Sequence, residues 1–416
     1  MKQQLLALVA LTLGLINNGA AQSQSPDIRD LPVIRNGSLL LLNNKPWKAV
    51  GANVYWLGLG ENVLPSPGEP YYPPFHASYP TPGRTSQIMS VITAMGGTTI
   101  RSHTLGVSVG NPLSLWPSPN QTNPDAFQPI DWAVYRARVY GLRLMVPLVD
   151  NFDYYHGGKY TFLRWAGFNL SRSADERNPQ VQEFYNNSKV VNLFKAYIET
   201  LLTHQNAYTN LTYAEDPTIF AIETGNELCG PVWGDMDVPT EWVRDIGRFV
   251  KELAPGKLFV DGTYGVNRTH FAAKEVDIFS NHYYPVSTAK LQRDLETLAS
   301  VDKPYFAGEY GWLGNAATAD ASLPAWYRQI ERDPKVMGDT FWSLFGHNVP
   351  ECNTFVEHND GFTMQYGNPA HAAQIKIVRQ HFVKMSQGLS ISADAELPPV
   401  ACPAPTSLTE VTPLNV

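Results

Sequence analysis

Eight short apolar segments alternate with amphipathic helical patterns along most of the chain, and this alternation constrains the fold more than any other feature. The apolar segments span residues 47–56, 97–103, 143–150, 218–226, 258–262, 277–283, 305–309 and 339–344. The helical patterns span residues 85–95, 130–140, 190–204, 242–253, 289–299, 321–331 and 371–385, with a short connection at 268–274. Strands that alternate with helices indicate parallel βαβ units, and eight units predict a single-domain α/β fold, the (β/α)8 TIM barrel. An open doubly wound sheet is disfavoured because no glycine-rich nucleotide loop follows the first segment.

Long loops follow several of the expected strands, at residues 58–83, 104–128, 151–188 and 345–368. In a barrel these loops lie on the C-terminal face, and loops of such length in a compact domain are usually functional. Several carry aromatic side chains, notably Trp116, Tyr154, Tyr155 and Trp165. We therefore expect them to wall an open groove on that face. A short hairpin is expected at residues 31–45, before the first barrel strand.

The N-terminus has the pattern of a secretory signal peptide. Lys2 precedes an apolar run at residues 5–16 that is too short to span a bilayer, and small residues follow at 19–21. We predict cleavage after residues 1–21, a catalytic domain at 22–386, a poorly ordered tail at 387–416 and a secreted, extracellular protein. The net charge is −7 without a basic cluster, which argues against nucleic acid or an anionic membrane as a partner. We expect a monomer.

Secretion changes the meaning of two other features of the sequence. Six Asn-X-Ser/Thr sites follow the leader, which together predict a glycoprotein. The three cysteines, Cys229, Cys352 and Cys402, allow one disulfide bond and leave one thiol, and the sequence does not decide the pair. No spacing of Cys or His fits a metal site, and no cofactor is expected.

Two of the expected strands end in a glutamate. The run at 218–226 leads into Asn226-Glu227, and the run at 305–309 ends in Glu309. An apolar strand has no use for such polar residues at its carboxyl end unless that end opens into a site. Because parallel barrel strands end on one face, the two carboxyl groups are expected to lie opposite one another. A paired-carboxylate reaction such as glycoside hydrolysis needs this arrangement.

Other strand ends add polar and aromatic groups. Arg101 closes the second strand, His282 and Tyr284 close the sixth, and Trp342 lies in the eighth. Each has a structural explanation on its own: an ion-pair partner, a core histidine or barrel packing. Together they favour a site in which Arg101 keeps Glu309 ionised and Trp342 gives a flat surface for a sugar ring. Glu223 is expected to lie deeper and not to be catalytic.

The set Arg101, Asn226-Glu227, His282-x-Tyr284, Glu309 and Trp342 resembles glycoside hydrolase family 5 of clan A. The segments 43–47 and 51–56 are similar to the opening of fungal endo-β-1,4-mannanases of that family. The resemblance implies that Glu227 is the acid/base, that Glu309 is the nucleophile and that the anomeric configuration is retained. It also implies a mannan substrate. We expect Arg101, Asn226, His282, Tyr284 and Trp342 to bind this substrate, together with Trp116 and Tyr154 from the aromatic loops. Ser102-His103-Thr104 and the loop from Asp150 to His156 depart from the mannanase pattern.

Two alternatives stay open at this point. Within the same family, the enzyme could attack chain ends or another β-1,4-linked polysaccharide or oligosaccharide. From a different class, the chain could be an inactive barrel that binds glycans, although the intact Glu227 and Glu309 argue against it. A metal-dependent hydrolase is disfavoured because no His-x-His or clustered Asp ligands occur at strand ends.

Overall fold

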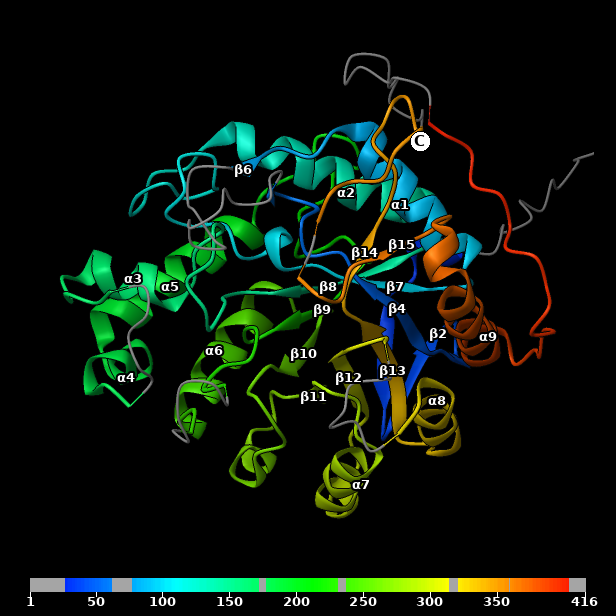
Figure 1. Cartoon of the computed structure of the whole chain (residues 1–416). Coiled ribbons are helices and arrows are strands. Elements are labelled where there is room, and N and C mark those ends of the chain that lie inside the picture. The colour runs from blue at the N-terminus through cyan, green and yellow to red at the C-terminus, as the bar shows by residue number, and fades with distance from the viewer. Residues whose placement is uncertain are drawn as a thin grey trace, which may run out of the picture.

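The computed structural model describes residues 27–61, 77–171, 177–230, 237–313, 321–358 and 360–403. Its centre is a closed barrel of eight parallel strands, hydrogen-bonded in the order β10-β11-β12-β13-β4-β7-β8-β9 (Figure 1). The strands are β4 (Ala49–Asn53), β7 (Thr99–Arg101), β8 (Arg143–Pro147), β9 (Ile219–Glu223), β10 (Leu258–Asp261), β11 (Ile278–Tyr283), β12 (Tyr305–Tyr310) and β13 (Val336–Phe341). The predicted barrel is therefore confirmed.

Helices surround the barrel on its outside (Figure 1). They are α1 (Pro82–Ala94), α2 (Phe127–Val139), α3 (Lys159–Ala166), α4 (Pro179–Asn186), α5 (Ser188–Leu202), α6 (Thr240–Leu253), α7 (Thr288–Thr297), α8 (Leu323–Arg332) and α9 (Ala372–Gln387). Local sequence sets their starts: Thr81 caps α1 ahead of a proline, and Asn187 caps α5. Each helix then buries one stripe, as α6 does with Trp242 and Val250.

The structure differs from the predicted elements in three places. The last strand begins at Val336 and ends at Phe341, three residues before the predicted bounds. The segment 151–188, predicted as a loop, contains α3 and α4, which pack against α5. The short connection near 268–274 is a 3-10 turn at Arg268–Ala272.

The predicted N-terminal hairpin covers the barrel end opposite the long loops. Strands β1 (Val33–Asn36) and β2 (Leu39–Leu42) are antiparallel, and Gly37 takes a φ of 60° in the turn between them. Val33 and Leu40 are buried in a second apolar cluster, together with residues at the amino ends of the barrel strands. The short β3 (Lys45–Pro46) pairs with β2 and leads into β4. This end is therefore packed, and the opposite end is left for a site.

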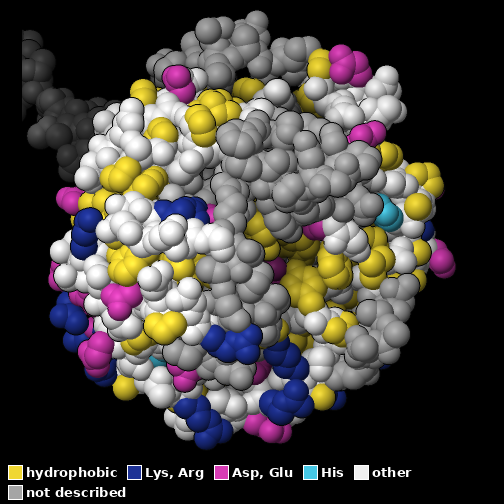
Figure 2. Space-filling view, turned by 60° about the vertical axis from the view of Figure 1, so that its left-hand side comes forward, with side chains coloured by type: hydrophobic (Ala, Val, Ile, Leu, Met, Phe, Trp, Pro, Cys, Tyr) yellow, Lys and Arg dark blue, Asp and Glu magenta, His cyan; other side chains and the backbone are white. Residues whose placement is uncertain are grey.

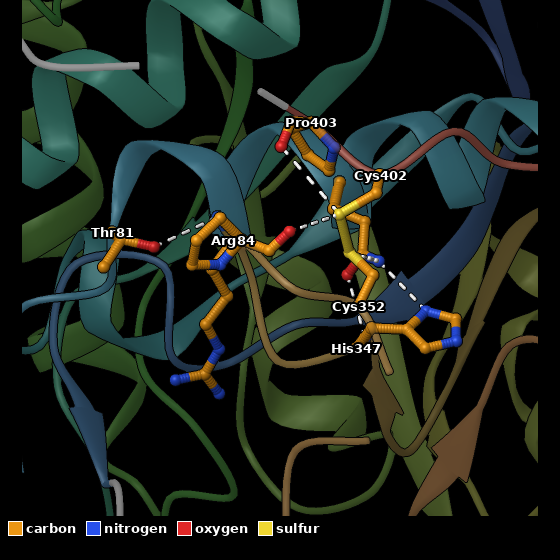
Figure 3. Close-up of a disulfide and its surroundings, with 8 residues drawn as sticks. Thr81, Arg84, His347, Cys352, Cys402 and Pro403 are labelled. Atoms are coloured by element: carbon orange, nitrogen blue, oxygen red, sulfur yellow. Dashed lines mark hydrogen bonds between the residues drawn. A yellow bond between two sulfur atoms is a disulfide. The ribbon is translucent and has the colours of Figure 1, made fainter. Parts of the chain in front are cut away.

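A disulfide bond joins Cys352 to Cys402 (Figure 3). Cys229 takes no part in it and is buried, with its Sγ 3.6 Å from the Tyr185 hydroxyl. The bond ties the loop after the last barrel strand to the segment that follows α9. Residues 388–403 also bond to the body of the protein, since Tyr366 donates to the Pro398 carbonyl. These contacts attach residues 388–403 to the body of the protein, in the segment where the sequence predicted a poorly ordered tail. The predicted signal peptide lies outside the described residues, and no described helix is long and apolar enough to cross a membrane.

Candidate active site

A cavity of about 250 Å³ opens at the carboxyl ends of the barrel strands. Figure 2 shows one face of the molecule with a hollow near its centre, edged by hydrophobic side chains and holding acidic ones. The cavity is lined by Tyr55, His103, Asp150, Tyr154, Tyr155, His156, Asn226, Tyr284, Glu309, Trp342, His358, Asp360 and Phe362. The predicted residues Asn226, Tyr284, Glu309, Trp342 and Tyr154 are therefore brought together.

Glu227 and Glu309 form a close carboxyl pair. Glu309 lies within β12, and Glu227 follows β9 with a left-handed φ of 51°. His282, on β11 between them, has its Nδ1 atom 2.7 Å from Glu227 Oε1 and 3.6 Å from Glu309 Oε2. One oxygen of each glutamate and this nitrogen all lie within 4.8 Å of one another. An inverting mechanism needs a wider separation of the two carboxyl groups, because a water must fit between one of them and the sugar. The short separation here therefore favours the retaining mechanism.

Arg101 is the centre of the polar network beneath this pair. The guanidinium is fully buried and donates from Nη1 to Glu309 Oε1 at 2.7 Å and from Nε to Glu223 Oε2 at 2.9 Å. Its Nη2 donates to Asn226 Oδ1 at 2.9 Å. Tyr284 donates its hydroxyl to the other Glu309 oxygen at 2.9 Å. Glu309 is thus held at both oxygens, and Glu223 lies deeper, paired with Arg101.

The two carboxyl groups differ in what surrounds them. Burial, followed by the charge of Asp150, raises the pKa of Glu227 to about 7. Burial also raises the pKa of Glu309, while contacts with His282, Arg101 and Tyr284 act against that rise. The predicted influence of Arg101 on Glu309 is present, but burial outweighs it. Burial lowers the pKa of His282 to about 3, so its ring is neutral beside the pair.

Trp342 forms an aromatic wall with Tyr55. The two rings stack at 4.9 Å between centroids, with 8° between their planes. The Trp342 indole donates to Asp360 Oδ2 at 2.6 Å, and the Tyr55 hydroxyl bonds His358 Nε2 at 2.8 Å. Both partners come from the loop that the disulfide ties down. This loop therefore holds the aromatic wall in place.

The structure does not bring Trp116 to the cavity. Its ring is 2% exposed and packs edge-on against Tyr197 at 5.5 Å, inside the core. Trp165 likewise packs against Phe162, on α3. Trp116 therefore lies outside the lining of the cavity that holds the other predicted residues. These indoles pack inward because a tryptophan side chain buries a large apolar area when it lies against neighbouring helices.

Four cavity residues were missed as site residues by the sequence analysis: Tyr55, His103, Asp150 and Phe362. Tyr155, His156, His358 and Asp360 lie in the loops that were expected to wall the groove, and they do line the cavity. His103 Nε2 lies 3.5 Å from Glu309 Oε1, and its ring meets Trp342 edge-on. His103 and Asp150 are the last residues of the predicted strands 97–103 and 143–150, so the strand-end argument could have found them. His358 and Asp360 come from a loop without a periodic signal.

The described residues also contain one group that could hold a metal ion: Glu227, His282 and Glu309. These are the same side chains that form the carboxyl pair. Hydrogen bonds already engage these side chains: His282 contacts Glu227, and Arg101 and Tyr284 donate to Glu309. The arrangement therefore fits acid–base and nucleophilic chemistry without a metal.

Comparison with known proteins agrees with this geometry. Residues 92–293 match the family model described as GH family 5 beta-mannosidase-like. Mannan endo-1,4-beta-mannosidase 3 of Oryza sativa subsp. japonica is 30% identical over 297 residues, covering 58% of this chain and 61% of the relative. The putative mannan endo-1,4-beta-mannosidase P of Arabidopsis thaliana is 26% identical over 318 residues, covering 76% and 68%.

Solved structures share the fold. The endo-1,4-beta-mannanase of Rhizomucor miehei superposes with a TM-score of 0.67 at 21% identity, covering 86% of this chain and 99% of that chain. The family 5 mannosidase of the same organism superposes with a TM-score of 0.65 at 16% identity, covering 87% and 98%.

Proposed function

We propose that this chain, which matches the family 5 β-mannosidase-like model over residues 92–293, hydrolyses β-1,4-linked mannan with retention of configuration. The names of its relatives from Oryza sativa and Arabidopsis thaliana, both mannan endo-1,4-β-mannosidases, support mannan as the substrate and internal bonds as the target. The observation that carries the reaction type is the close carboxyl pair, Glu227 and Glu309, bridged by His282.

In the first step Glu309 attacks the anomeric carbon while Glu227 protonates the departing glycosidic oxygen. The carbon–oxygen bond breaks, the shortened chain leaves as an alcohol, and the sugar stays on Glu309 as an ester. The hydrogen bonds from Arg101 and Tyr284 hold the Glu309 oxygens for this attack. The raised pKa of Glu227 supplies the proton near neutral pH.

In the second step Glu227, now ionised, removes a proton from water, and the water oxygen attacks the same carbon. The ester bond to Glu309 breaks, so two inversions give net retention. In this proposal Asn226 bonds the sugar 2-hydroxyl and Trp342 supports the ring, which their positions in the cavity lining support. His282, neutral at working pH, keeps a hydrogen bond to Glu227 throughout.

A second candidate is release of sugars from chain ends. The carboxyl pair can act on an internal bond or on a terminal one, so the length of the first products distinguishes the two candidates.

Secretion as a glycoprotein is also part of the proposal, with a leader at residues 1–21 and a catalytic domain at 22–386. Its support is the N-terminal sequence and the surface position of acceptor sites, since Asn36, Asn120, Asn186 and Asn210 are exposed. The disulfide bond fits an oxidising compartment. Mass spectrometry of the secreted protein, before and after glycan removal, tests both statements.

The substrate is tested by initial products on mannan, glucomannan, cellulose and xylan. The proposal predicts mixed manno-oligosaccharides early in the reaction, with the β-anomer formed first in proton NMR spectra. A single monosaccharide or disaccharide from the start would favour the chain-end reaction. An α-anomer formed first would overturn retention.

A further inference from the structure

Asp150 lies at the edge of the carboxyl pair without being part of it. It follows β8 and is fully buried in the wall of the cavity. Its Oδ1 accepts hydrogen bonds from Asn226 Nδ2 at 3.2 Å and from the Phe152 backbone N–H at 2.9 Å. Its Oδ2 lies 3.0 Å from His156 Nε2. A buried carboxylate with this many donors occupies one fixed position.

The first consequence concerns the side-chain amide of Asn226. Its oxygen accepts from Arg101 Nη2, and its nitrogen donates to Asp150. A flipped amide would set an N–H against the guanidinium and an oxygen against the carboxylate, which are two repulsive contacts. Arg101 and Asp150 therefore allow a single orientation, and this leaves one N–H of Asn226 for a ligand in the cavity.

The second consequence concerns Glu227. Asp150 is the nearby charge that disfavours ionisation of Glu227, and it acts in the same direction as burial to raise the pKa. Arg101 and Lys290 act in the opposite direction. The titratable or charged groups around Glu227 are Arg101 on β7, Asp150 after β8, Glu223 on β9, Tyr264 after β10, His282 on β11, Tyr284 after β11, Lys290 on α7 and Glu309 on β12.

We propose that Asp150 is a positioning residue for the hydrolysis, which fixes the Asn226 amide and keeps Glu227 in its acid form before each turnover. The proposal rests on the proposed role of Glu227 as the acid/base. His156 holds the Asp150 carboxylate from the other side, and its own ring is fully buried among Tyr154 and Tyr155. Asp150 acts through Asn226 and Glu227, and no bond to the substrate is assigned to it.

The two roles separate in two variants. Asp150→Asn removes the charge but keeps an oxygen that accepts from Asn226 and from the Phe152 N–H. Asp150→Ala removes both the charge and that acceptor. Asp339→Asn is the matched control, because Asp339 is a buried aspartate bonded to His381 at 2.9 Å, on β13 and outside the cavity lining.

The experiment measures kcat/KM against pH on mannan and on a dinitrophenyl mannoside, whose leaving group needs no proton. For Asp150→Asn we expect the alkaline limb on mannan to move to lower pH by about one unit, within the usual effect of a neighbouring charge. At pH values above this limb, kcat/KM of the variant on mannan should be about tenfold lower than that of the wild type. On the activated substrate it should be less than threefold lower. Asp150→Ala loses a further factor of about ten on both substrates, because the Asn226 amide is released.

Thermal unfolding of each variant accompanies the kinetics. Any loss of kcat/KM in the control Asp339→Asn should be equal on both substrates. If Asp150→Asn behaves in the same way, or if the alkaline limb of its kcat/KM profile on mannan does not move, the proposal is overturned and Asp150 is a structural residue. The hydrolysis of mannan by the wild-type enzyme is measured first. If the wild-type enzyme does not hydrolyse mannan, this result counts against the proposed substrate and not against the role of Asp150. The comparison would then use whichever β-glycan the wild-type enzyme cleaves.

Discussion

Replacing Arg101 by Met tests how much the buried guanidinium contributes to stability and to the ionisation of Glu309. The substitution keeps much of the side-chain volume but leaves two buried carboxylates, Glu223 and Glu309, without the guanidinium now 2.8 and 2.7 Å away. Removing one partner of a buried ion pair costs about 3–5 kcal/mol. Loss of a positive charge at this distance raises a carboxyl pKa by about 1–3 units. Glu309 must be ionised to attack, so the acidic limb of kcat/KM should move to higher pH by that amount.

The stability change has a definite pH dependence. In the variant the folded-state pKa of Glu223, already raised to about 7 by burial, and that of Glu309 rise further above the unfolded value. The wild-type and variant proteins therefore differ little in this term while Glu223 stays protonated in both folded states. The loss relative to wild type grows as pH rises through about 7, the wild-type pKa of Glu223, towards the higher pKa of the variant. Urea unfolding at about pH 5 and about pH 9 should give a smaller loss of unfolding free energy at the lower pH.

Arg143→Met is the matched control for this prediction. Arg143 is also buried, on the next strand β8, but its Nη2 donates to the backbone carbonyls of Ile28 and Leu31. Its loss should cost stability without moving the acidic limb. An Arg101→Met profile with an unmoved acidic limb, or a stability loss of the same size at both pH values, would refute the reasoning.

Four further predictions follow from the same contacts. Glu227→Ala should lose most activity on mannan but retain glycosylation with a dinitrophenyl leaving group, and azide should restore turnover as a β-glycosyl azide. Asp360→Asn should weaken the bond to the Trp342 indole, raising KM several-fold with little change in unfolding temperature, as steady-state kinetics and calorimetry would report. Cys352→Ser with Cys402→Ser should lower the unfolding free energy by about 4 kcal/mol, the chain-entropy value for residues 50 apart, measured by denaturant titration. Exhaustive chelation should leave activity unchanged, and a loss restored by one divalent ion would count against a metal-free reaction.

The residues that could be predicted from the sequence are those fixed by strand geometry. Arg101, Asn226, Glu309 and Trp342 lie on or just after barrel strands, and parallel strands bring their carboxyl ends to one face whatever the loops do. The apolar segments located those strands to within a few residues. For this reason the fold and the centre of the site follow from periodicity and from polar residues at strand ends.

The rest depends on how the long loops fold, which periodicity does not encode. Trp116 and Tyr154 both lie in aromatic loops, yet one is buried in the core and the other lines the cavity. Asp360 reaches Trp342 from a loop tied down at Cys352, and three cysteines left the pairing undecided. Long-range contacts such as these are set by tertiary packing, and a single sequence offers no local signal for them.

The central claim is that Glu309 forms a covalent bond to the sugar. Incubation with a 2-deoxy-2-fluoro-β-mannosyl fluoride slows the second step, so the ester should accumulate and activity should fall with time. Peptide mass spectrometry should then find one fluorosugar on the segment Tyr305–Tyr310, at Glu309. A label on Glu227, or time-dependent turnover without any labelled peptide and with an α-anomer as first product, would contradict the account.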